Sequence, residues 1–147
     1  EAEEATEVSP NAPPIEMRTI QQIAFEGKRY IIDHDERLIG TLVDVYEKGN
    51  VIYIDRDAPE RFFEGLALSE LVTRKFLRKG LGWADAHAEG DKAEKEYYNT
   101  KYGIVESAEL FYDELKLQAW KFEQEKKEFK EEGGHKVIYE KGEILPK

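Results

Sequence analysis

The chain has no cysteine among its 147 residues, so disulfide bonds, thiolate metal ligands and thiol nucleophiles are excluded. It contains no apolar run that approaches the roughly 18 residues of a membrane-spanning helix, and its first residues lack the pattern of a secretory signal. Basic residues are fewer than acidic ones, and the formal net charge is -10. Because an acidic surface repels phosphate backbones, we expect no nucleic-acid partner, and we expect no membrane partner either.

The residues that are present suffice for one folded domain. The hydrophobic fraction of 40% and the aromatic fraction of 12% allow a buried core. Composition divides the chain into an acidic, proline-rich tail (residues 1–14), a single domain (residues 15–132) and a C-terminal strand or arm (residues 133–147). Both ends are candidate arms for contact with other protein chains.

Short β-type runs dominate the first part of the domain. They are predicted at Thr19 to Phe25, Lys28 to Asp33, Gly40 to Tyr46 and Val51 to Asp55. Glu26-Gly27 joins the first two runs as a hairpin turn. The third run also fits helical spacing; we assign it as a strand because a turn and a further strand follow it.

Three helices are predicted after the strands, at Glu60 to Lys79, Trp83 to Lys101 and Ser107 to Glu132, with Ser107 as the cap of the third. Apolar residues recur at helical spacing along the third helix: Phe111, Leu115, Ala119, Phe122 and Phe129, with Leu117 and Trp120 beside them. The predicted fold class is therefore α+β. It consists of a small N-terminal antiparallel sheet packed on two or three helices, a long C-terminal helix and a terminal strand or arm.

Two of these helices carry polar residues in the layout of a zinc hydrolase site. Such enzymes place a His and the following Glu on one helix, where the His binds the metal and the Glu takes a proton from metal-bound water. Here the first helix contains Ser69-Glu70-Leu71-Val72-Thr73. The segment Gly80-Leu81-Gly82 then leads into a second helix that carries His87 and Glu94.

With these motifs, the stretch from about Val51 to Asn99 resembles a family of small zincin-like proteins of archaea and tailed phages. The family pattern is a helix with H-E-x-x-E, then G-x-x-Y-x-x-A-H, then a downstream Glu. The chain departs from it at two positions: Ser69 stands where the family has its first His, and Thr73 stands where it has its second acid. The resemblance implies a metallohydrolase scaffold with a degenerate metal site.

The departure at Ser69 decides what we expect of a cofactor. A serine hydroxyl is a poor ligand for zinc, which prefers imidazole, thiolate or carboxylate. We therefore expect no cofactor; the alternative is a divalent cation held loosely by His87, Glu94 and Asp91. If Glu70 and His87 are buried without metal, we expect them to form an ion pair with each other.

The function that follows is a non-enzymatic structural or interaction protein with protein partners, in a homo- or hetero-oligomeric assembly. Analogy with the phage relatives implies a virion or morphogenesis role, so we expect a cytoplasmic or virion-associated location. Two alternatives stay open. One is a metal-dependent hydrolase with Glu70 as the general base, and the other is an acidic regulatory binder that mimics nucleic acid.

Overall fold

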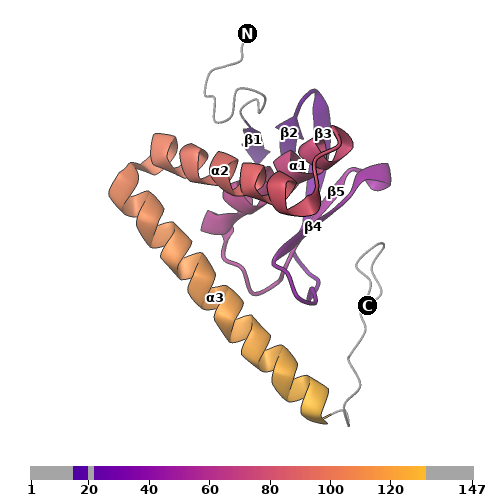
Figure 1. Cartoon of the computed structure of the whole chain (residues 1–147), viewed down its shortest axis with the longest axis vertical. Coiled ribbons are helices and arrows are strands. Elements are labelled where there is room, and N and C mark those ends of the chain that lie inside the picture. Colours follow the sequence, from indigo (N-terminus) through magenta and orange to yellow (C-terminus); the bar gives the residue numbers. More distant parts are fainter. Residues whose placement is uncertain (1–14, 20–21, 132–147) are drawn as a thin grey trace.

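The computed structural model describes residues 15–19 and 22–131, and it confirms an α+β fold (Figure 1). A sheet is followed along the chain by three helices, of which the last is the longest. The predicted tail (residues 1–14) and the predicted terminal strand or arm (residues 133–147) lie outside the described residues. None of the helices in the described part of the chain is long and apolar enough to cross a membrane.

The strands of the described part form one sheet in the order β1-β2-β3-β5-β4. Their bounds are β1 Glu16–Thr19, β2 Gln22–Phe25, β3 Lys28–Asp33, β4 Val43–Tyr46 and β5 Val51–Ile54. The predicted hairpin turn at Glu26-Gly27 is confirmed, since both residues have positive φ (52° and 81°) and Phe25 pairs with Lys28. Two successive residues with positive φ are typical of the turn that matches strand twist.

The sheet is mixed rather than wholly antiparallel. The pairs β2/β3 and β4/β5 are antiparallel, as predicted. The pair β1/β2 is also antiparallel, although Thr19 to Phe25 was predicted as one strand, and β3 and β5 pair in parallel. The chain leaves β3, forms β4 at the edge of the sheet and returns through β5 into the position beside β3. The prediction missed this pair because the sequence between β3 and β4 shows no helical crossover, which usually accompanies parallel strands.

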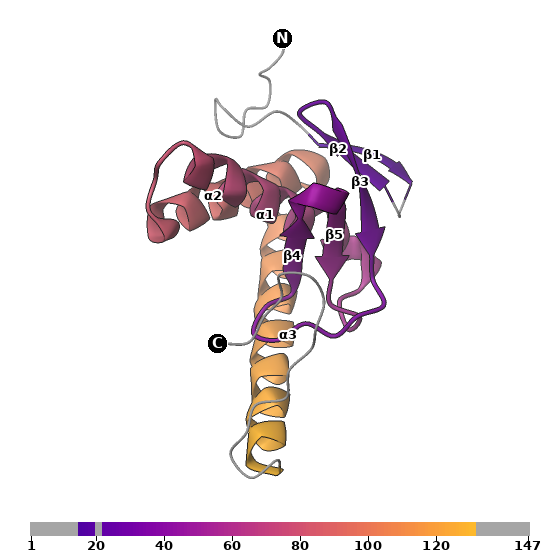
Figure 2. The ribbon, with the colours of Figure 1, turned by 90° about the vertical axis from the view of Figure 1, so that its right-hand side faces the viewer.

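Helix α1 (Phe63–Arg78) supplies most of the helical part of the core and follows a short 3-10 turn at Glu60–Phe62. Six apolar residues at helical spacing along this helix are buried: Phe63, Ala67, Leu71, Leu68, Val72 and Phe76. Each large side chain that is removed from water contributes roughly 1.5–3 kcal/mol. Figure 2 shows α1 between the sheet and helix α2 (Trp83–Tyr102), and α1 contacts both.

Helix α3 (Ile104–Glu131) begins earlier than predicted. Gly103 has φ 92° and separates α2 from α3, and the backbone N–H of Ser107 already donates to the carbonyl of Gly103. The prediction of Ser107 as the helix cap is therefore wrong; Ser107 is a buried residue of the first helical turns. Because α3 already begins at Ile104, Ser107 does not mark its start.

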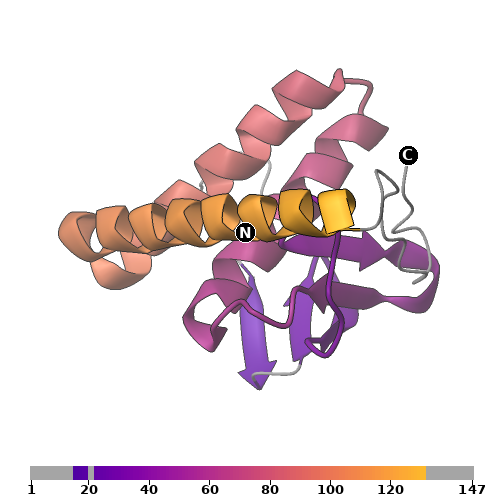
Figure 3. The same ribbon diagram turned by 90° about the horizontal axis from the view of Figure 1, so that it is seen from below.

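The long helix α3 runs along one side of the molecule, and its far end extends beyond the sheet (Figures 1 and 2). With 28 residues, it is about 42 Å long. Seen from below, it crosses in front of the sheet and the other helices (Figure 3). One side of α3 therefore faces the domain and the other faces away from it.

Candidate functional site

The two degenerate motif positions, Ser69 and Thr73, lie in the contact between α1 and α2. Both are buried, and the hydroxyl of Thr73 donates to the carbonyl of Ser69 at 2.8 Å. Opposite them is Gly90 of α2, where an added Cβ would lie 2.2 Å from Thr73 Oγ1 and 2.4 Å from Ser69 O. The positions that carry a His and an acid in the zincin-like pattern are thus used here for close helix packing.

Glu70 lies beside this contact and interacts with Arg74. Arg74 Nε donates to Glu70 Oε2 at 3.0 Å, and Arg74 Nη2 lies 2.6 Å from Asp44 Oδ1 on β4. Burial raises the pKa of Glu70 above its ordinary value, although the neighbouring guanidinium of Arg74 opposes this shift. The ion partner of Glu70 is therefore Arg74 and not His87, which the sequence had suggested for a buried pair.

His87 lies on the outer side of α2 and is half-exposed. Its side chain is 45% exposed, and its ring stacks on Trp83 with 4.7 Å between the ring centroids. His87 Nδ1 is 3.5 Å from Asp91 Oδ2, one helical turn later. His87 and Asp91 are thus brought together as predicted, but at the protein surface.

Glu94 is buried and faces Glu114 of α3. Burial, together with the charge of Glu114, raises the pKa of Glu94 well above its ordinary value. The hydroxyl of Tyr98 donates to Glu114 Oε2 at 3.1 Å. Glu94 Oε2 has no hydrogen-bond partner within the described residues. Glu94 and Glu114 thus face each other between α2 and α3.

The candidate ligands therefore have different neighbours. Glu70 contacts Arg74, His87 contacts Asp91 at the surface, and Glu94 contacts Glu114 between two helices. Across residues 15–19 and 22–131, no three His, Asp or Glu side chains are placed to hold one metal ion. The arrangement of these residues does not fit the zincin-like metal site, and we derive no catalytic step through a metal.

Arg74, Tyr98 and Glu114 were not among the site residues that the sequence predicted. The pattern that could have revealed Glu114 is its helical spacing from Ser107 and Lys121, since all three are buried on the inner side of α3. Polar residues that recur on one helical face indicate that this face contacts polar groups of the fold.

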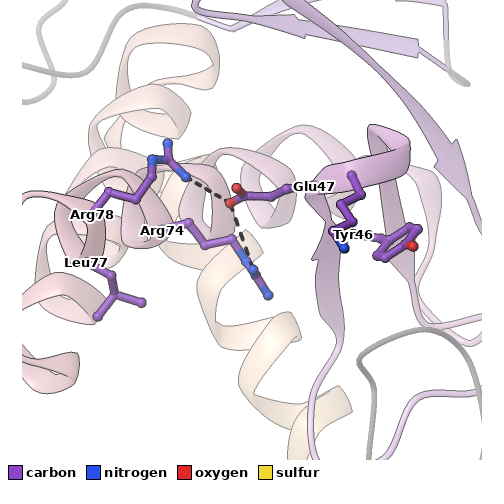
Figure 4. Close-up of a pocket in the computed structure, with 6 residues that line it drawn as sticks. Tyr46, Glu47, Arg74, Leu77 and Arg78 are labelled. Carbon is purple, nitrogen blue, oxygen red and sulfur yellow. Dashed lines mark hydrogen bonds and ion pairs between the residues drawn. The ribbon is translucent and has the colours of Figure 1, made fainter.

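An open pocket of about 460 Å³ lies between the end of β4 and the last turns of α1. Figure 4 shows Arg74 and Arg78 on one side, both directed to Glu47. Arg78 Nη1 is 2.8 Å from Glu47 Oε2, and Arg74 Nη1 is 3.9 Å from the same atom. Acidic side chains already neutralise both arginines, so neither arginine presents the free positive charge that an anionic ligand requires.

The inner side of α3 is tied to the sheet by buried charges. Lys121 Nζ lies 2.7 Å from Asp55 Oδ2 and 3.3 Å from Glu125 Oε2, and it also donates to the carbonyl of Leu38. Glu125 in turn accepts from the backbone N–H of Gly40 at 2.8 Å. These contacts hold α3 in one orientation relative to the domain.

The opposite side of α3 carries a row of exposed apolar residues, which we call the outer face. Its members are Val105, Ala108, Tyr112, Leu115, Ala119 and Phe122. They alternate in steps of three and four residues, which is the heptad spacing of helices that pair side by side. Tyr112 and Leu115 are each 62% exposed.

The predicted stripe on this helix is therefore divided between two sides. Leu115, Ala119 and Phe122 belong to the outer face, whereas Phe111 is half-buried and packs edge-on against Tyr98, with ring centroids 5.4 Å apart. Exposed apolar residues in a row, such as Leu115, Ala119 and Phe122, are unusual on a solvated helix. Such a row is typical of an interaction site.

Comparison of the chain with protein families, with curated protein sequences and with solved structures finds no match. The resemblance to zincin-like proteins therefore stays a prediction.

Proposed function

We propose that this is a non-enzymatic interaction protein and that the outer face of α3 pairs with a helix of another protein chain in an assembly. The observation that carries the proposal is the heptad row of exposed apolar residues along a helix whose inner side is firmly attached to a folded domain. An amphipathic helix normally turns its apolar side toward its own domain. Here α3 buries Glu114 and Lys121 beside Leu110 on its inner side, and it leaves the apolar residues of the outer face exposed.

The attachment of α3 favours binding because the helix is already ordered. Helices that fold only on binding lose conformational entropy at that step, which weakens their affinity. Anchored through Lys121 and Glu125, α3 presents Tyr112, Leu115 and Phe122 in a fixed row. Burial of each of these side chains in a complex contributes roughly 1.5–3 kcal/mol.

Sedimentation velocity of the full chain tests this proposal, with Leu115→Glu as the test variant and Leu77→Glu as the matched control. Both residues are leucines in helices with exposed side chains, but Leu77 lies on α1, away from the outer face. We expect the wild-type chain and the Leu77→Glu variant to associate in the micromolar range, and the Leu115→Glu variant to sediment as a monomer. All three proteins should keep the same thermal unfolding midpoint when diluted to monomers. A monomeric wild-type chain would contradict self-association through the outer face, and association that survives Leu115→Glu would contradict the use of this face.

A metal-dependent hydrolase is the second candidate, favoured by the raised pKa of Glu70, which suits a general base. Its test is metal analysis of protein purified without chelator. Stoichiometric zinc that is lost in the His87→Ala variant would favour the hydrolase over the interaction protein. The nucleic-acid-mimic alternative needs a continuous acidic surface, and it is less well supported because Glu47 and Asp113 are paired with Arg78 and Arg61.

A further inference from the structure

We infer that the edge of the sheet at β4 is closed against strand addition by Asp44, which Arg74 holds in place. Strand β4 ends the sheet that the described residues form, with β5 on one side of it and a free edge on the other (Figure 2). A free edge presents backbone groups to which a strand of another protein chain can add. The inference concerns this edge and does not depend on the outer face of α3.

The register of β4 shows which of its backbone groups point to the free edge. The N–H of Asp55 donates to the carbonyl of Leu42 at 2.8 Å, so Leu42 bonds toward β5. Along an antiparallel pair, residues that bond to the partner strand alternate with residues whose N–H and C=O point away from it. Val43, which lies opposite Ile54, and Val45 therefore direct their backbone groups to the free edge.

Side chains of the same segment bind these outward backbone groups. The hydroxyl of Thr41 accepts from the N–H of Val43 at 3.3 Å and donates to the carbonyl of Val43 at 3.0 Å. Asp44 Oδ1 accepts from the N–H of Val45 at 2.9 Å. An added strand must displace both side chains before it can form its own hydrogen bonds with β4.

Arg74 of α1 holds Asp44 at the edge. Arg74 Nη2 lies 2.6 Å from Asp44 Oδ1, the same atom that accepts from Val45, and the Arg74 and Asp44 side chains are only 27% and 16% exposed. Glu70 accepts from Arg74 Nε at 3.0 Å and fixes the guanidinium on its other side. Because an added strand would separate this ion pair and bury the unpaired charges, Asp44 opposes strand addition more strongly than a neutral side chain does.

The sequence around Asp44 supports the same role. Asp44 is the only charged residue between Gly40 and Tyr46. Its neighbours Val43 and Val45 are β-branched and favour strands. Short runs of high β-propensity without charge add readily to one another, and a single charge within such a run prevents this.

Hydrogen exchange of the full chain, followed by NMR under monomeric conditions, tests the closed edge. We expect the amide of Val45 to exchange at least about tenfold faster in Asp44→Ala than in wild type, because one hydrogen bond to a charged group is lost. The amide of Ile52 on β5 reports opening of the whole sheet and should change less. Asp35→Ala, which removes an exposed aspartate after β3, is the matched control. Unchanged exchange of Val45, or equal acceleration of Val45 and Ile52, would overturn the inference.

Sedimentation velocity tests the consequence for strand addition, in a Leu115→Glu background so that the outer face does not contribute. We expect the Asp44→Ala/Leu115→Glu chain to form oligomers at micromolar concentration, where the Leu115→Glu chain stays monomeric. Glu70→Gln in the same background removes the other carboxylate bound to Arg74 but leaves Asp44 in place, and it should also stay monomeric.

The outcomes separate this inference from the proposed function. A monomeric Asp44→Ala/Leu115→Glu chain would overturn the role of Asp44 at the edge. Equal association of the Glu70→Gln control would overturn it too, because loss of an ion pair, rather than an open edge, would then cause association. Association of the Leu115→Glu chain by itself contradicts the proposed function, and the exchange of Val45 still decides the inference in that case.

Discussion

Lys121 of α3 lies 2.7 Å from the carboxylate of Asp55, directly after β5, and both side chains are buried, with only 3% and 0% exposed. Asp55 also accepts the backbone N–H groups of Leu38 and Asp57, at 2.9 Å each. A carboxylate with this many donors and a buried counterion is well satisfied inside the protein. This ion pair explains why the inner side of α3 is charged, and it fixes which side of the helix faces outward.

Loss of Lys121 should destabilise the domain strongly. The variant Lys121→Met keeps the bulk of the side chain but leaves Asp55 buried without its counterion, and breaking such a pair costs about 3–5 kcal/mol. Urea denaturation gives the free energy of unfolding. The control Lys126→Met removes an exposed lysine of the same helix and should change stability by less than about 0.5 kcal/mol. Equal stabilities for the two variants would mean that the buried ion pair contributes nothing.

Gly90→Ala should separate α1 from α2. The new Cβ would lie 2.4 Å from the backbone oxygen of Ser69, which cannot move without shifting α1. Overpacking of this kind costs about 1–3 kcal/mol, although alanine has the better helix propensity by about 1 kcal/mol. If Gly90→Ala lowers the thermal unfolding midpoint, the cost of the clash must exceed the gain in helix propensity. Gly82→Ala, where no atom lies within 4 Å of the added Cβ, is the control; a stabilised Gly90→Ala variant would argue against the close contact.

Glu94→Gln should change how stability depends on pH. Burial raises the pKa of Glu94 in the folded protein above its ordinary value of 4.5, so the folded state keeps a proton that the unfolded state releases. The stability contributed by this group is present at low pH and is lost as the pH rises through the folded pKa. Tyr98 and Glu114 face the same position, and Asp91 raises the pKa further.

We therefore expect Glu94→Gln to gain stability relative to wild type as the pH rises above about 4.5. Urea denaturation at several pH values between acid and neutral measures this difference. Glu109→Gln, at an exposed position of α3, serves as the control. Parallel pH profiles for wild type and Glu94→Gln would show that the pair does not hold a proton.

Arg74→Met should raise the pKa of Glu70 further. Burial raises this pKa and the guanidinium of Arg74 lowers it, so removal of the guanidinium leaves the effect of burial unopposed. NMR titration of the Glu70 side-chain carboxyl measures the change. Arg78→Met removes a neighbouring cation that is paired with Glu47 and should leave Glu70 unchanged. An unaltered Glu70 titration in Arg74→Met would contradict the ion pair.

The candidate site was only partly predictable from sequence. The substitution of a hydroxyl residue at position 69 was visible as a departure from a zinc-binding motif, because ligand chemistry depends on residue type. The close contact of Ser69 and Thr73 with Gly90 was not visible, since it depends on how two helices cross. The same holds for Glu94, whose partner Glu114 comes from a third helix twenty residues later in the chain.

The sequence by itself determined the local elements. Its local patterns predicted three helices, and Glu26-Gly27 predicted the first hairpin, because such patterns act through residues that are near in the chain. The tertiary structure decided the parallel pairing of β3 with β5, the ion pair of Glu70 with Arg74 and the side of α3 that faces outward. These features depend on contacts between distant segments. On α3, the burial of Lys121 against Asp55 holds that side of the helix inward and leaves the apolar row exposed.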